Sequence, residues 1–220
     1  MNTFLVLCVN TFAAYIGALP LLIILQFLFR RSQLPKRHQF GLYLYALTIC
    51  FILMSTDSPS LYQLKLAPSF NLIPFYRFTD NYIHYLQAFV VFVPFGLLLP
   101  SLWEQFRSLK KTLFHGLLFS AFIELSQIFC LQATAITDIT DILANILGTL
   151  TGYLLSTQMC KFAFMGRVCL TGKTRQKERL ASKEACLYFL APWLVTFLVT
   201  PFISNALWDF IWNNAVGMAM

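Results

Sequence analysis

Five polar residues within otherwise apolar stretches are the candidates for chemistry in this sequence. Glu124 and Gln127 are three residues apart, which places both side chains on one face of a helix. Asp138, Asp141 and Asn145 follow at steps of three and four residues, so they share one face of a second helix. We expect all five to line one polar cavity as binding residues. Glu124, Asp138 and Asp141 are also the candidate catalytic groups, because positioned carboxyl groups act as general acids or bases.

Three chemistries suit this set of side chains. Carboxylate and amide oxygens are ligands for a divalent cation. Glu124 can transfer a proton if burial changes its acidity. The same groups can also hydrogen-bond the amides or sugars of a lipid-linked substrate. The sequence itself predicts no resident metal ion and no cofactor.

Each acid also has a structural interpretation. Glu124 can form a buried hydrogen bond between helices, because an ionisable group at membrane depth costs about 2.5–3.5 kcal/mol and therefore finds a partner. Asp138 can cap the N-terminus of the helix that follows it, and Asp141 can complement the dipole of that helix. The sequence leaves the binding and structural interpretations open.

Glycine and proline residues within the apolar stretches predict how the helices pack. The stripe of Asp138, Asp141 and Asn145 continues at the same spacing through Gly148 and Gly152, and small residues four apart allow a neighbouring helix to approach closely. Pro94 and Gly96 lie in another apolar stretch, where proline frees a carbonyl and bends a helix. We predict structural roles for all four residues, with the bend at Pro94 as one way to open a polar pocket.

The composition is that of an integral membrane protein. Hydrophobic residues make up 58% of the 220 residues and charged residues only 11%, against about a quarter in soluble domains. A helix needs about 20 apolar residues to cross a bilayer. The sequence therefore predicts an all-α, polytopic bundle of about six transmembrane helices, over residues 3–29, 39–56, 82–103, 112–137, 142–160 and 185–208.

The basic residues predict the orientation of this bundle. All of the 16 Lys and Arg residues except Lys65 and Arg77 lie in alternate connections, after the first, third and fifth predicted spans. The positive-inside rule places those connections in the cytoplasm and both termini outside. The net charge of +7 is then explained by contact with anionic lipid headgroups, and we predict no nucleic-acid partner.

Four segments organise the chain. Residues 1–70 hold the first two spans and the start of an outer loop, residues 71–160 form a core with three spans, residues 161–184 form a basic cytoplasmic loop, and residues 185–220 hold the last span and a tail. The six cysteines include no Cys-x-x-Cys pair, and four of them fall in apolar runs. We therefore predict neither a disulfide framework nor a zinc site.

Three blocks of this core resemble the VanZ-like family of bacterial membrane proteins. The blocks are Asn71-Leu-Ile-Pro-Phe75, Phe92-Val-Pro-Phe-Gly-Leu-Leu-Leu99, and Glu124-x-x-Gln127 followed by the acidic and glycine stripe from Thr137 to Gly152. Two positions depart from the family pattern: Ala88 stands where many members carry Asn, and Ala135 where many carry Arg.

The resemblance implies a multi-pass protein of the bacterial cytoplasmic membrane that is linked to low-level resistance to glycopeptides such as teicoplanin. We expect it to affect glycopeptide susceptibility or cell-envelope homeostasis through an outward-facing polar site. Its expected partners are the lipid bilayer and a lipid-linked cell-wall precursor or glycopeptide. The alternatives are an intramembrane enzyme acting on a lipid-linked or peptide cell-wall substrate, a transporter, and a purely structural protein.

Overall fold

The computed structural model describes residues 3–31, 36–56, 70–71, 73–74, 78–127, 137–159 and 178–217. These residues form helices almost throughout. The elements are α1 (Thr3–Arg31), α2 (Lys36–Ser55), β1 (Phe70–Asn71), α3 (Phe78–Leu102), the 3-10 helix η1 (Glu104–Arg107), α4 (Leu109–Gln127), β2 (Thr137–Asp138), α5 (Ile139–Met159), α6 (Glu178–Leu198) and α7 (Thr200–Gly217).

The structure confirms an all-helical membrane bundle. Within the described residues, four helical stretches are long and apolar enough to cross a bilayer, and α1 holds a shorter apolar stretch, Tyr15–Phe27. The four are His38–Ser55, Tyr82–Leu102, Ile139–Met159 and Leu187–Asn214. Helix α4 is not apolar enough to be counted with them, because its 19 residues include Lys110, Lys111, Glu124 and Gln127. The count of six spans and the outward termini therefore stay predictions.

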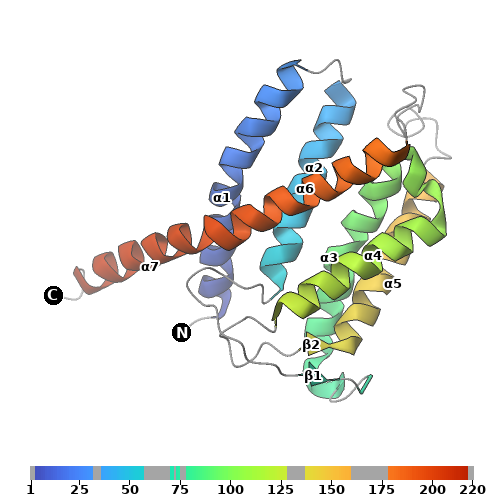
Figure 1. The fold of residues 1–220 in the computed structure, drawn as a ribbon. Helices are drawn as coiled ribbons and strands as arrows, with labels where there is room; N and C mark the ends of the chain where they lie inside the picture. Colours follow the sequence, from blue (N-terminus) through green and yellow to red (C-terminus); the bar gives the residue numbers. More distant parts are fainter. Residues whose placement is uncertain are drawn as a thin grey trace.

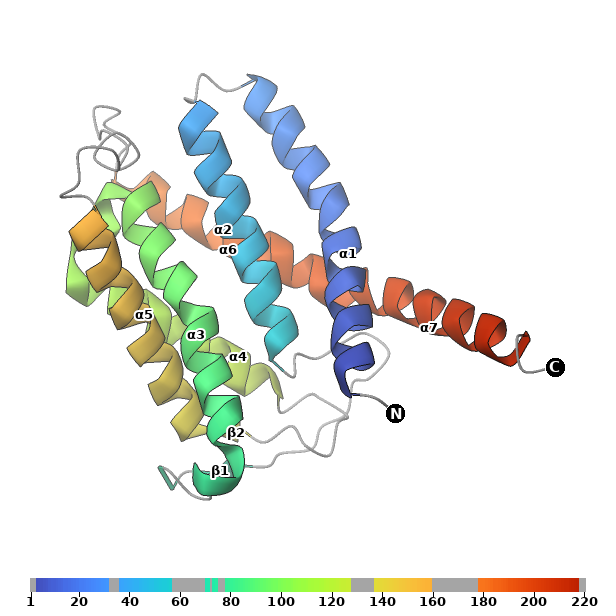
Figure 2. The same ribbon diagram turned by 180° about the vertical axis from the view of Figure 1, so that it is seen from behind.

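The first five helices alternate in direction along the bundle (Figures 1 and 2). As a result, the end of α2, the start of α3, the end of α4 and the start of α5 meet at one end. The strands β1 and β2 pair in parallel at this same end, with Phe70 opposite Thr137 and Asn71 opposite Asp138. All five predicted binding residues belong to elements that end or begin here.

Helices α3 and α5 pack closely through glycines. A Cβ atom added at Gly148 would overlap the carbonyl oxygen of Phe89, and one at Gly152 would overlap that of Val93. From the other side, a Cβ atom at Gly96 would overlap the carbonyl oxygen of Thr149. The two backbones are therefore as near as glycine alone allows, and α3 and α5 form a firm base for the polar end of the bundle.

The last two helices form a long rod that differs from the predicted sixth span. Only Val199 separates α6 from α7, because Pro201 has no amide hydrogen to continue the helix. The rod crosses the bundle obliquely and projects beyond it (Figures 1 and 2). Its 1.5 Å rise per residue over residues 178–217 gives a length of about 60 Å, about twice the thickness of the hydrocarbon core.

The rod includes parts of two segments for which the sequence predicted no helix. The predicted tail after residue 208 continues as helix to Gly217, and α6 begins at Glu178, inside the segment predicted as a basic loop. The rest of that loop, residues 161–177, lies outside the described residues, as do most of the two predicted outer connections.

Candidate functional site

Asp138 is the hydrogen-bonding centre of the polar end of the bundle. It directly precedes α5, and its Oδ1 accepts a hydrogen bond of 2.8 Å from the amide of Thr140, as an N-cap residue does. Its Oδ2 accepts hydrogen bonds of 3.0 Å from the hydroxyl of Tyr85 and from Nδ2 of Asn71. The capping interpretation thus describes this residue, whose two oxygens are already occupied by three donors.

Glu124 lies in the last described turn of α4. The predicted span ran to residue 137, and residues 128–136 of it lie outside the described residues. Glu124 is only 1% exposed, and its Oε2 accepts a hydrogen bond of 3.1 Å from the amide of Asp138. The carboxyl group therefore satisfies a backbone donor at the start of α5 and ties the end of α4 to it.

Asp141 lies in the first turn of α5 and is 5% exposed. Its Oδ2 is 3.2 Å from Nε2 of His84, whose side chain is 51% exposed. Its Oδ1 is buried and has no hydrogen-bond partner among the described residues. Asp141 therefore combines one paired oxygen with one that is free to accept a hydrogen bond.

Asn145 repeats this arrangement one turn further along α5. It is 1% exposed, and its Nδ2 donates a hydrogen bond of 2.9 Å to Oγ of Ser120 on α4. This bond turns the amide so that Oδ1 is the remaining polar atom, and Oδ1 is buried without a described partner. Gln127, the fifth predicted residue, is also buried, at the end of α4.

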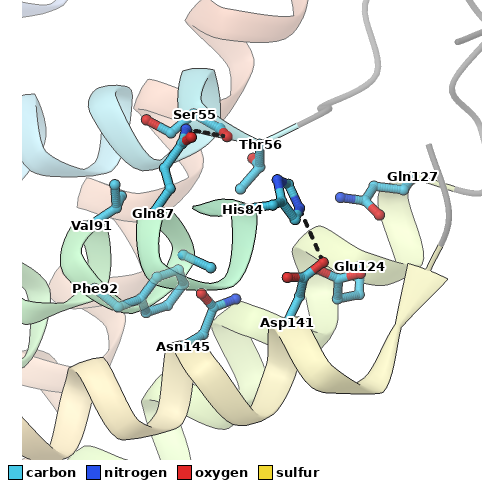
Figure 3. Close-up of a pocket in the computed structure, with 11 residues that line it drawn as sticks. Ser55, Thr56, His84, Gln87, Val91, Phe92, Glu124, Gln127, Asp141 and Asn145 are labelled. Atoms are coloured by element: carbon cyan, nitrogen blue, oxygen red, sulfur yellow. Dashed lines mark hydrogen bonds and ion pairs between the residues drawn. The ribbon is translucent and has the colours of Figure 1, made fainter. Parts of the chain in front are cut away.

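These side chains line one small cavity, shown in Figure 3. His84 and Gln87 of α3 face Asp141 and Asn145 of α5 across it. The cavity has a volume of about 20 Å³, enough for one water molecule or a group of that size. Its lining consists of Ser55, Thr56, His84, Gln87, Ala88, Val91, Phe92, Glu124, Gln127, Asp141 and Asn145.

The structure brings four of the five predicted binding residues to this cavity. Glu124, Gln127, Asp141 and Asn145 line it, whereas Asp138 lies behind it and holds Glu124 through its backbone amide. Pro94 is on the exposed side of α3 and does not line the cavity. Gly96, Gly148 and Gly152 are at the α3–α5 contact, farther along both helices from the polar end.

Besides His84, Gln87 and the other lining residues, the site includes three residues outside the predicted set that bond a predicted one: Asn71, Tyr85 and Ser120. Each contacts a predicted residue from a distant part of the chain, with a separation of 67, 53 and 25 residues respectively. Asn71 carried a signal, since it begins the first family-like block. The position of Ala88, where many family members carry Asn, lies in the cavity wall, and Gln87 beside it supplies an amide there.

The arrangement suits hydrogen bonding and proton transfer more than metal binding. Among the described residues, no group of three or more His, Cys, Asp or Glu side chains is placed to hold a metal ion. The open groups of the cavity are instead acceptor oxygens on Asp141 and Asn145, with the imidazole of His84 beside them. A ligand that enters must therefore bring hydrogen-bond donors.

Comparison with known proteins gives one family and no individual relative. No curated protein and no solved structure matches the chain significantly. The family described as VanZ/LLP1 matches residues 12–161, a range that includes α2 to α5 and every residue that lines the cavity. This range is more than half of the 220 residues, and the chain therefore belongs to the VanZ/LLP1 family.

Proposed function

We propose that this protein is a multi-pass component of the bacterial cytoplasmic membrane that alters susceptibility to glycopeptides, teicoplanin among them, or the homeostasis of the cell envelope. It acts by binding a ligand in the cavity between the end of α2 and helices α3, α4 and α5. The basic connections predict that this end of the bundle faces outward, where glycopeptides and lipid-linked cell-wall precursors meet.

One observation carries the proposal. Asp141 and Asn145 each keep a buried acceptor oxygen without a described partner, in a cavity lined by α2, α3, α4 and α5. An unsatisfied buried polar group costs about 1–3 kcal/mol, which a side chain needed only for packing would avoid. Such groups are stable in a site that receives a ligand.

The test compares charge-neutral variants of the site with matched variants outside it. Glu124→Gln and Asp141→Asn change buried carboxyl groups of the cavity, while Glu104→Gln and Asp209→Asn make the same changes at exposed positions. Each variant is expressed in a host that lacks its own copy, at equal membrane abundance, and teicoplanin susceptibility is measured.

We expect the wild type and both exposed-site variants to raise resistance and both cavity variants to lose that effect. If the cavity variants protect the host as well as the wild type does, the acids serve the architecture alone. If the wild type itself changes neither teicoplanin resistance nor tolerance of cell-wall stress, the envelope role is wrong.

A second function, an intramembrane enzyme acting on a lipid-linked or peptide cell-wall substrate, has one observation in its favour. Nε2 of His84 is 3.2 Å from Asp141, beside a cavity with room for one water molecule. Such a pair can take a proton from water while Glu124 supplies one to a leaving group. Purified protein incubated with labelled precursor, with and without divalent cations, separates the two functions: a product that the Asp141→Asn variant does not form favours the enzyme.

A further inference from the structure

The two open oxygens of the cavity define what a ligand must offer. Asp141 and Asn145 are four residues apart on α5, where Cβ atoms are about 5–6 Å from each other. Both residues line the same cavity, so one ligand can be offered to both Oδ1 atoms. The cavity volume of about 20 Å³ limits that group to about the size of one water molecule.

The fixed orientation of both side chains makes the requirement stricter. Ser120 holds the amide nitrogen of Asn145, and His84 holds the second oxygen of Asp141, so both open atoms are acceptors. A ligand that satisfies both acceptors must then supply at least two hydrogens. A hydroxyl supplies one, a water molecule two and a primary ammonium three. A guanidinium group also has enough hydrogens, but its four heavy atoms need more room than a cavity that holds about one water molecule.

The charge of the side chains around the cavity favours an ammonium group over a water molecule. Glu124 and Asp141 bring two carboxyl groups to the cavity, and Asp138 places a third behind Glu124. Among the residues that the structure describes, no Lys or Arg side chain lines it, and His84 is the basic group there. A cation that donates hydrogen bonds to Asp141 offsets this surplus of acids, which a neutral water molecule does not.

The surroundings of the cavity indicate where the ligand comes from. His84 is half exposed, so the cavity reaches the surface beside it. The neighbouring side chains of α3, Ile83 and Leu86, are 65% and 56% exposed and apolar, as lipid-facing residues are. Because residues 82–102 of α3 form a candidate membrane span, the opening lies near the end of that span, at the level expected for the headgroups of lipids.

We propose that this cavity binds a primary ammonium group, with Asp141 and Asn145 as its acceptors, His84 at its entrance and Ser120 as the residue that positions Asn145. This proposal uses the same cavity as the proposed function and rests on it in that respect alone. It names the chemical class of the ligand, which two sources can supply: a membrane lipid with a primary amine in its headgroup, or a free amine at the membrane surface.

The experiment measures thermal unfolding of the full chain in nanodiscs of phosphatidylcholine, which has no primary amine. Ethanolamine is the probe for a free amine, and choline is its matched control, with the same charge but three methyl groups in place of the N–H hydrogens. Nanodiscs in which part of the lipid is phosphatidylethanolamine test the lipid source. The protein variants are Asp141→Asn and Asn145→Leu, with Asp209→Asn and Asn213→Leu as exposed controls on α7.

We expect a primary amine at about 100 times its Kd to raise the Tm by about 5 °C in the wild type and in both controls. Choline leaves the Tm unchanged, and neither cavity variant responds to the amine. A response to phosphatidylethanolamine but not to ethanolamine identifies a lipid headgroup, and the reverse identifies a free amine.

Three results would overturn the inference: no response to either amine source, an equal response to choline, or a full response in Asp141→Asn. These outcomes are independent of the resistance assay. If the amines have no effect but Asp141→Asn still loses teicoplanin protection, the proposed function stands and the ligand class is wrong. If the amines bind but the variants still protect, the site is real and the envelope role is wrong.

Discussion

Replacing Asp138 by Ala tests how much the hydrogen bonds of this one side chain stabilise the polar end of the bundle. The variant loses three hydrogen bonds, from the amide of Thr140 and from the side chains of Tyr85 and Asn71. An N-cap contributes about 1 kcal/mol, and each of the two side-chain bonds contributes about the same. We therefore expect the free energy of unfolding to fall by about 3 kcal/mol.

The assay is denaturation of the purified protein in mixed micelles, followed by loss of helical circular dichroism. Asp209→Ala is the matched control, because Asp209 is exposed on α7 and should change stability by less than about 0.5 kcal/mol. The stability of Asp138→Asn should lie between those of Asp138→Ala and Asp209→Ala. The amide keeps the capping oxygen but turns its NH2 group, a donor, toward the Nδ2 donor of Asn71. An Asp138→Ala variant within about 1 kcal/mol of wild type would refute the reasoning, because at least two of the three bonds would then contribute nothing.

Three further predictions use the same protein. Gly152→Ala should lose about 2 kcal/mol in the denaturation assay, because its Cβ atom overlaps the backbone of α3, whereas Leu155→Ala at an exposed position of α5 should be near neutral. Tyr85→Phe should lose about 1 kcal/mol, because Asp138 loses one donor, while the exposed Tyr82→Phe should not; equal losses would contradict the contact. Alkaline phosphatase fused after Thr56 should be active and fused after Ser108 inactive, and the reverse pattern would place the cavity on the cytoplasmic side.

The sequence predicted the helices and the stripe because both follow from local spacing. Apolar stretches of about 20 residues form helices in a membrane whatever they pack against, and steps of three and four place side chains on one face. The stripe of α5 is buried along its length, from Asp141 to Gly152, as its spacing indicated. Its glycine end packs on α3 and its polar end lines the cavity.

What the sequence did not predict depends on contacts between distant segments. Glu124 was expected in the middle of a span, because apolar residues continue after it to Thr137, yet its carboxyl group accepts a hydrogen bond from the amide of Asp138, directly before α5. Asn71 reaches Asp138 through the β1–β2 pairing, and no local pattern predicts two strands of two residues each. Likewise, the length of the α6–α7 rod follows from helical residues that hydropathy alone assigned to a loop and a tail.

The stripe on α5 also explains how a binding site is compatible with a stable membrane bundle. Its first residue, Asp138, is saturated with donors, and its glycines make the backbone contact with α3. The two residues between them, Asp141 and Asn145, are the ones that retain an open acceptor. An unsatisfied acceptor destabilises the fold, so it persists where rigid contacts on both sides hold it in place. The capping and binding interpretations of the acids are therefore compatible: they describe neighbouring residues of one helix, and the capped end keeps the open end in position.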